Sequence, residues 1–296
     1  MKKRKFKIGL TIAYIVLIIY ALISLFPFFW SALVSFTPMN YADETGTRRG
    51  VNIMEWPPSI SFFTLPPTLF KAPASGENYA KVFEITPYGR WIINTVLYAV
   101  LVTFGHLLFD SFGGYAFARL KFPLKNFWFT LFLATMMIPG QVTLIPQYNL
   151  MVSFGFINTF YGLVLPKLTG VFGLFLMKQF FTSIPRELEE AAKIDGAGYL
   201  KTYFKIILPM AKPAITALGI YIFLGTWNDF LWPLLMTSDK SMYTLTVGLD
   251  FFKSSYYTFW QYMMSATIMM TIPMIVIFLS FQKNFVDTGA STAVKG

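Results

Sequence analysis

Long apolar runs separated by short polar clusters make up most of this 296-residue chain. A helix needs about 20 mostly apolar residues to cross the hydrocarbon of a bilayer. Six stretches meet this requirement, namely 8–36, 91–118, 127–145, 159–181, 213–236 and 260–281. The pattern therefore predicts an all-α integral membrane protein with six transmembrane helices.

Two segments between the apolar runs have features of their own. The uncharged run 126–166 is too long for one span, and Pro139-Gly140-Gln141 with Pro146-Gln147 predicts a hairpin inside it. Segment 37–90 mixes Pro, Gly, Ser and charges of both signs, which is typical of a solvated loop. Within it, residues 77–83 predict a short amphipathic helix before the second span.

Composition agrees with a membrane protein. Hydrophobic residues make up 55% of the chain and charged residues 13%, which is too little polar surface to cover a soluble globule of this size. Cysteine is absent from the sequence, which excludes disulfides, thiolate metal sites and a cysteine nucleophile.

Basic residues predict the orientation, because short loops rich in Lys and Arg stay on the cytoplasmic side. Such residues gather in the first seven positions, in the loop after the second span and in the loop after the fourth span; they are Lys2, Lys3, Arg4, Lys5, Lys7, Arg119, Lys121, Lys125, Arg186, Lys193, Lys201, Lys205 and Lys212. Both termini are therefore predicted to be cytoplasmic. These flanks account for most of the +10 charge, so no nucleic-acid partner is needed.

The first apolar run is too long for a signal peptide and lacks a small-residue cleavage site, which predicts a retained helix.

The loop after the fourth span has the most distinctive sequence of the chain. Ser183 is predicted to cap a helix over 186–195, with Pro185 near its start and acidic residues in its first turns. Gly196 then allows a sharply turned backbone. A second helix is predicted to pack through apolar residues at helical spacing, and Pro209 and Pro213 to turn the chain into the fifth span. That packing face consists of Leu200, Tyr203, Phe204, Ile207 and Leu208.

This loop resembles the EAA loop of binding-protein-dependent ABC importers. The resemblance rests on Glu190-Ala191-Ala192, on Asp195-Gly196-Ala197 and on the apolar stretch that ends in Leu208-Pro209. It implies a type I ABC importer permease fold, in which a short helix of the membrane subunit sits in a groove of an ATP-hydrolysing subunit. The small side chains of Ala191 and Ala192 would then let the helix sit close in the partner's groove. Glu190 and Asp195 would pair with basic or backbone N–H groups of the groove, and Gly196 would set the bend between the two helices of the loop. The alternative is a cytoplasmic helix that only links two spans.

Two further stretches are similar to the carbohydrate branch of that family. Residues 227–233, Trp-Asn-Asp-Phe-Leu-Trp-Pro, with 244–249 after them, look like the end of the fifth span in sugar permeases, and Ala293-Val294-Lys295-Gly296 looks like their inward tail. The resemblance covers 77–296. It implies three parts: a first helix with an extracytoplasmic loop over 1–89, an ABC transmembrane domain over 90–282 and a cytoplasmic tail over 283–296.

The energy for transport would come from another polypeptide, because the sequence contains no Gly-rich loop ending in Gly-Lys-Ser/Thr. ATP and Mg²⁺ would bind to that partner, with no cofactor in this chain. The resemblance implies a heteromeric complex in the bacterial inner membrane, made with a second permease subunit, two ATP-binding subunits and an extracytoplasmic solute-binding protein.

Charged residues inside spans are costly and are candidates for a substrate path. The candidates for a translocation path are Asp110, Lys167, Trp227, Asn228 and Asp229. For the single histidine, His106, packing or hydrogen bonding is expected rather than catalysis. Asp110 and Lys167 either form a buried ion pair or contact substrate. As an unpaired cation, Lys167 would favour an anionic or heavily hydroxylated sugar, such as an acidic oligosaccharide.

Two other functions compete with the importer. A secondary transporter would keep the intramembrane charges, but such proteins often have two related halves, and the sequence has none that we detect. A membrane-embedded glycan enzyme is disfavoured because the chain has no His-Glu-x-x-His pair, no Gly-x-Ser-x-Gly elbow and no carboxylate cluster on an inner face of the spans.

Overall fold

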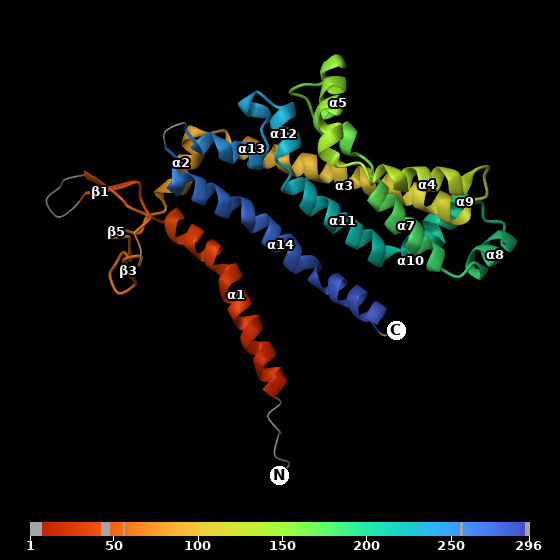
Figure 1. Ribbon diagram of the computed structural model, residues 1–296, viewed down its shortest axis with the longest axis horizontal. Coiled ribbons are helices and arrows are strands. Elements are labelled where there is room, and N and C mark those ends of the chain that lie inside the picture. The colour runs from red at the N-terminus through yellow and green to blue at the C-terminus, as the bar shows by residue number, and fades with distance from the viewer. Residues whose placement is uncertain (1–7, 43–47, 56, 255–256, 294–296) are drawn as a thin grey trace, which may run out of the picture. The chain divides into compact units, whose positions relative to one another are not determined.

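Three long helices match three of the predicted spans (Figure 1). The computed structural model describes residues 8–42, 48–55, 57–254 and 257–293. The long helices are α1 (Ile8–Ser35), α3 (Tyr88–Arg119) and α14 (Trp260–Ala293). In the described residues, these three are long and apolar enough to cross a membrane. The predicted basic N-terminal cluster and residues 294–296 lie outside the described residues.

The three remaining predicted spans are bent pairs of helices instead of single rods. α4 (Lys125–Thr135) and α5 (Gly140–Ser153) meet at 96°. α6 (Phe160–Val164) continues into η1 (Leu165–Lys167) and is followed by α7 (Val171–Ser183), with a bend of 43°. If each bent pair is counted as one span, the described part of the chain contains up to six.

The predicted hairpin around Pro139 and Pro146 is wrong in detail. The chain turns at 136–139, but Pro146 lies inside α5. A helix lacks one amide hydrogen bond at an internal proline and can still continue through it at a cost. The connection to the next span lies farther on, at residues 154–159, where Gly155 has a φ of 72°.

The fifth predicted span also ends earlier than expected. α11 (Lys212–Trp227) follows a 78° bend after Tyr199–Met210, as the two prolines predicted, but it stops at Trp227. Asn228 donates its backbone N–H to the Leu224 oxygen, and Asp229 donates to the Thr226 oxygen, which closes the last turn. The chain resumes as α12 (Leu231–Met236), so Asn228 and Asp229 lie in an irregular turn.

The chain forms two compact units. The first contains Met1–Tyr88 and Leu249–Pro273. Part of the predicted irregular loop in this unit is folded into two small antiparallel sheets, which the sequence analysis missed. One pairs β1 (Asn40–Ala42) with β2 (Arg48–Gly50), and the other contains β3 (Ile60–Ser61), β4 (Thr68–Leu69) and β5 (Ala72–Pro73). η4 (Asp250–Phe252) and the start of α14 complete the unit.

The amphipathic helix predicted over 77–83 is confirmed as α2 (Glu77–Ile85). Its buried Asn78 donates its side-chain amide to the backbone oxygens of Ser35 and Thr37, both at 2.8 Å. These bonds satisfy carbonyl groups that the end of α1 leaves without helical partners. In the same unit, the Lys71 ammonium 2.7 Å from Glu55 lowers the pKa of that carboxyl group.

The second unit contains Gly89–Gly248 and Met274–Gly296. α3 contributes to two buried clusters there, Tyr115 and Ala118 to one and Tyr98 and Val102 to the other. The first cluster also takes residues from α7, α11 and the segment before α11, and the second takes residues from α5, α6 and α12. η3 (Lys240–Met242) and α13 (Leu245–Leu249) pack beside the start of α3, where the Trp91 indole donates to the Lys240 oxygen at 2.7 Å. α3 therefore joins the two buried clusters of this unit.

Candidate functional site

The loop between α7 and α11 folds into the two short helical segments that the sequence predicted. α8 spans Glu187–Ile194 and is followed by α9 (Tyr199–Thr202), the π-helical turn η2 (Tyr203–Ile207) and α10 (Leu208–Met210). Glu187, Glu189 and Glu190 lie in the first turn of α8, where the helix dipole favours negative charge. The predicted cap by Ser183 is wrong, because its hydroxyl donates to the Phe180 oxygen and Arg186 occupies the N-cap position.

The predicted bend at Gly196 is confirmed. Gly196 has a φ of 74°, which favours glycine because it lacks a Cβ. Its N–H donates to the Lys193 oxygen at 3.0 Å, and the N–H of Ala197 donates to the Ala192 oxygen at 2.9 Å. This pair of bonds is a Schellman motif, which ends α8 and satisfies its last carbonyl groups.

A buried ion pair holds α8 against α3. Nε of Arg119, the last residue of α3, lies 2.9 Å from Oε1 of Glu189, and the two side chains are 3% and 20% exposed. The Arg119 guanidinium also donates to the Ile184 oxygen at the end of α7. One side chain therefore links the ends of α3 and α7 to the first turn of α8. A cavity of about 380 Å³ adjoins this link, lined in part by Lys121, Arg186 and Glu190.

The exposed surface of this loop differs from the prediction at several positions. Ala192 is buried, so its small size serves packing within this chain, whereas Ala191, Glu190 and Asp195 are exposed. Ile194 is 86% exposed. The predicted packing face of the second helix is correct for Tyr203 and Ile207, which are buried, and for Leu208, which packs against the same cluster. It is wrong for Leu200, which is exposed, whereas Phe204 is half-exposed and meets the ring of Phe112 edge-on. Tyr203 stacks on Phe112 of α3 with 4.8 Å between ring centroids.

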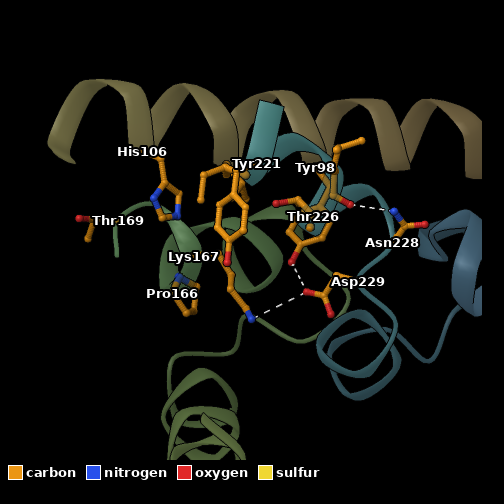
Figure 2. A pocket seen from close by; sticks show the side chains of 13 residues that line it. Tyr98, His106, Pro166, Lys167, Thr169, Tyr221, Thr226, Asn228 and Asp229 are labelled. Carbon is orange, nitrogen blue, oxygen red and sulfur yellow. Dashed lines mark hydrogen bonds and ion pairs between the residues drawn. The ribbon is translucent and has the colours of Figure 1, made fainter. Parts of the chain in front are cut away.

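The second candidate site is a cavity of about 610 Å³ in the same unit, between α3, the break before α7 and the end of α11 (Figure 2). Lys167, Asn228 and Asp229 line it, as do Tyr98 and Tyr221. The Asp229 carboxylate accepts a hydrogen bond from the Tyr98 hydroxyl at 2.8 Å and lies 3.8 Å from the Lys167 ammonium (Figure 2). Thr246 holds the turn itself by donating to the backbone oxygen of Asp229 at 2.6 Å.

The proposed ion pair between Asp110 and Lys167 is wrong, since each has a different partner. Asp110 is fully buried and lies 2.6 Å from Nδ1 of His106. Its other oxygen accepts hydrogen bonds from the Thr169 hydroxyl at 2.6 Å and the Gly170 N–H at 3.1 Å. Asp110 thus ties α3 to the break before α7, and a Cβ at Gly173 would collide with its carboxylate. His106 has the hydrogen-bonding role that the sequence indicated.

Trp227 is the other path candidate that the structure places elsewhere. Its side chain is 1% exposed, packs on Phe223 and does not contribute to the lining of the cavity. Three of the five path candidates, Lys167, Asn228 and Asp229, therefore meet at one surface, whereas Asp110 and Trp227 are packed in the protein interior.

Comparison with known proteins gives the family. The model of the family described as "Binding-protein-dependent transport system inner membrane component" matches residues 110–287. The chain belongs to this family. Among curated relatives, the arabinooligosaccharides transport system permease protein AraQ of Halalkalibacterium halodurans is 30% identical over 277 residues, 93% of each chain. The sn-glycerol-3-phosphate transport system permease protein UgpE of Yersinia pestis is 34% identical over 232 residues, 76% of this chain and 83% of the relative.

A solved structure supports the fold of this inner membrane component. This chain is similar to a chain in the crystal structure of a bacterial ABC transporter involved in the import of the acidic polysaccharide alginate. The TM-score is 0.77 at 22% identity, over 96% of this chain and 98% of the other. This likeness confirms the fold predicted from the EAA resemblance, that of an ABC importer permease.

Sequence reasoning missed two contributors to the sites of this inner membrane component. Arg119 was interpreted only as an inward-facing charge, because a basic residue at the end of a span has that role by default. Tyr98 lies in an apolar run, and no sequence signal pairs it with Asp229, 131 positions away.

Replacing Arg119 by Gln should loosen α8. Removing one partner of a buried ion pair costs about 3–5 kcal/mol, and partial exposure of Glu189 favours the lower end. Hydrogen exchange of the α8 amides should therefore become much faster in Arg119→Gln. The control is Lys121→Gln, which removes an exposed charge two residues away. Equal exchange in both variants would contradict the role of the ion pair.

Gly196→Ala should strain the end of α8. A left-handed conformation costs an alanine about 1–2 kcal/mol, so the amides of positions 196 and 197 should exchange faster. Gly198→Ala is a matched control, because neither glycine has an atom within 4 Å of its added Cβ but Gly198 has a φ of −75°. Equally slow exchange of these two amides in both variants would show that the turn does not need a glycine at position 196.

Proposed function

We propose that this chain is the permease subunit of an ATP-driven importer of oligosaccharides in the bacterial inner membrane. It would form half of the translocation path and pass the state of a separate ATPase to that path through α8. The observation that carries the proposal is a family-typical loop whose polar and apolar side chains face outward while Arg119 fixes the loop to α3. Carbohydrate cargo is supported by AraQ, a relative named for arabinooligosaccharides.

The exposed surface of α8 supports a role in docking. Glu190, Ala191 and Ile194 are all exposed, and their spacing places them within one turn of each other on the helix. Burial of the exposed Ile194 side chain in a groove would remove its apolar surface from water, which lowers the free energy of docking. Glu190 and Asp195 would pair with basic or backbone N–H groups of the ATPase, and Gly196 and Ala197 would maintain the bend next to it.

The proposed assembly has the parts that the family description requires in general. The family is dependent on a binding protein, and we propose in addition a second permease subunit and two ATP-binding subunits that hold ATP and Mg²⁺. Both termini and α8 would lie in the cytoplasm, with six spans between them. The proposed division is 1–89 for the first helix and outer loop, 90–282 for the transmembrane domain and 283–296 for the tail.

Coupling would be thermodynamic. ATP binding favours one arrangement of the ATPase pair, and subunits docked on that pair shift toward the conformation that fits it. Because Arg119 links α8 to the end of α3, a displacement of α8 would act on the helix that also forms a wall of the 610 Å³ cavity. Lys167, Asn228 and Asp229 are the residues that we propose for the path.

The acidic-cargo hypothesis loses its original support. It depended on an unpaired Lys167, and the structure places Asp229 3.8 Å from the Lys167 ammonium. The cargo named for relatives and neighbours also differs in charge, since arabinooligosaccharides are neutral whereas sn-glycerol-3-phosphate and alginate are anionic. The net charge of the cargo must therefore be argued from the cavity itself.

Glu190→Lys should reduce ATP-driven uptake strongly in vesicles that contain the whole complex. A reversed charge on the docking surface would face the groups that Glu190 pairs with, and like charges repel. Membrane insertion should remain normal. Glu84→Lys on α2 is the control, because it makes the same charge change at an exposed position outside the loop. Wild-type uptake by Glu190→Lys would exclude the docking role, and uptake driven by an ion gradient without ATP would favour a secondary transporter.

A further inference from the structure

Lys167 and Asp229 form a loose ion pair that leaves hydrogen-bonding capacity on both groups. The separation of 3.8 Å is longer than a direct N–H···O hydrogen bond. An ammonium group has three donors, and a carboxylate has about four acceptor positions. The Tyr98 hydroxyl uses one position of Asp229, and the backbone N–H of Trp232 approaches the other oxygen at 3.5 Å. The side chains of Lys167 and Asp229 are 39% and 20% exposed, so a ligand can reach both.

The pair lies where two hollows meet. Pro166, Lys167 and Asp229 line the 610 Å³ cavity and also a second cavity of about 310 Å³. The second cavity adds the side chains of Gln141, Thr143 and Gln147. Volumes of this size fit small-molecule sites, which range from about 300 to 1,000 Å³. A ligand of more than one unit could therefore extend past the pair.

The lining of these cavities carries no net positive charge. Apart from Lys167, Asp229 and His106, the described polar residues that line them have uncharged side chains. His106 lies against the buried Asp110 carboxylate, so this second pair adds no net positive charge. An anionic group that bound Lys167 would lie close to the Asp229 carboxylate, which is 3.8 Å from the same ammonium, and the two like charges would repel.

An aromatic ring completes the lining. Tyr221 lines the same cavity as Lys167 (Figure 2) and is 60% exposed. Phe172 packs on it with 4.9 Å between ring centroids, which supports the ring from another side. An exposed aromatic face beside a donor and an acceptor suits a sugar ring, because C–H groups can lie on the aromatic face while neighbouring hydroxyls bond to charged groups at the edge.

We infer that these joined cavities bind an uncharged, hydroxyl-rich sugar unit, with one hydroxyl on Lys167, a neighbouring hydroxyl on Asp229 and the ring over Tyr221. The inference rests on the proposed function and adds the charge class of its cargo. It also assigns a selective role to a balanced ion pair: the site accepts neutral sugars and disfavours acidic ones.

The test uses the whole complex in vesicles, with its binding protein and ATPase. Arabino-oligosaccharides are the neutral probe and alginate oligosaccharides the acidic probe. The two probes compete for ATP-driven uptake, and the measured quantity is the ratio of neutral to acidic probe taken up. The wild-type complex should prefer the neutral probe. Asp229→Asn leaves Lys167 unbalanced and should shift the ratio toward the acidic probe by about tenfold. Lys167→Gln should shift it in the opposite direction, and the double variant should return toward the wild-type ratio.

A second ion pair provides the control. Asp250 and Lys253 lie 3.0 Å apart and are both 51% exposed, so Asp250→Asn should leave the ratio unchanged. Preference of the wild type for the acidic probe, or an unchanged ratio in Asp229→Asn and Lys167→Gln, would overturn the inference while the importer function stands. Absence of ATP-driven uptake of both probes would overturn the proposed function, and the inference with it.

Discussion

The structure of the candidate coupling region depends on one buried cation. The Arg119 side chain is 3% exposed, pairs with Glu189 and donates to the Ile184 oxygen. A buried guanidinium is costly unless it is paired and hydrogen-bonded, and here the partners come from the ends of two other helices. This requirement fixes α8 relative to α3 and α7, although α8 has only eight residues and a mostly exposed surface. The short helix therefore has a defined position without a large core of its own.

α3 connects this region with the cavity. Its last residue holds α8, whereas Tyr98, Val102 and His106 of the same helix line the cavity that contains Lys167 and Asp229. Between these ends, Asp110 ties α3 to the break before α7 through Thr169 and Gly170. Buried polar groups need hydrogen-bond partners. A movement of α3 therefore either carries the break before α7 with it or requires new partners for Asp110. A continuous set of packed contacts thus joins the two proposed sites.

Local signals in the sequence predicted what depends on nearby residues. Apolar length predicted the three long helices and the regions of the three bent pairs, the glycine after Asp195 predicted the bend that ends α8, and the polar residues at 228–229 marked the cavity. Pairings between distant residues could not be predicted, because helical spacing says nothing about which span faces which. The partner of Lys167 is Asp229, 62 positions away, instead of Asp110, and the small strands in 40–73 depend on tertiary packing of segments too short to show a period.

The coupling that we propose requires α8 to bind an ATP-hydrolysing subunit. A photo-cross-linking residue at Ile194, 86% exposed on α8, tests it directly in the assembled complex, with the fully exposed Phe63 of the first unit as the control position. We expect an adduct between position 194 and the ATPase, and no ATPase adduct from position 63. A complex that hydrolyses ATP in response to sugar but gives no ATPase adduct at position 194 would show that α8 does not dock there.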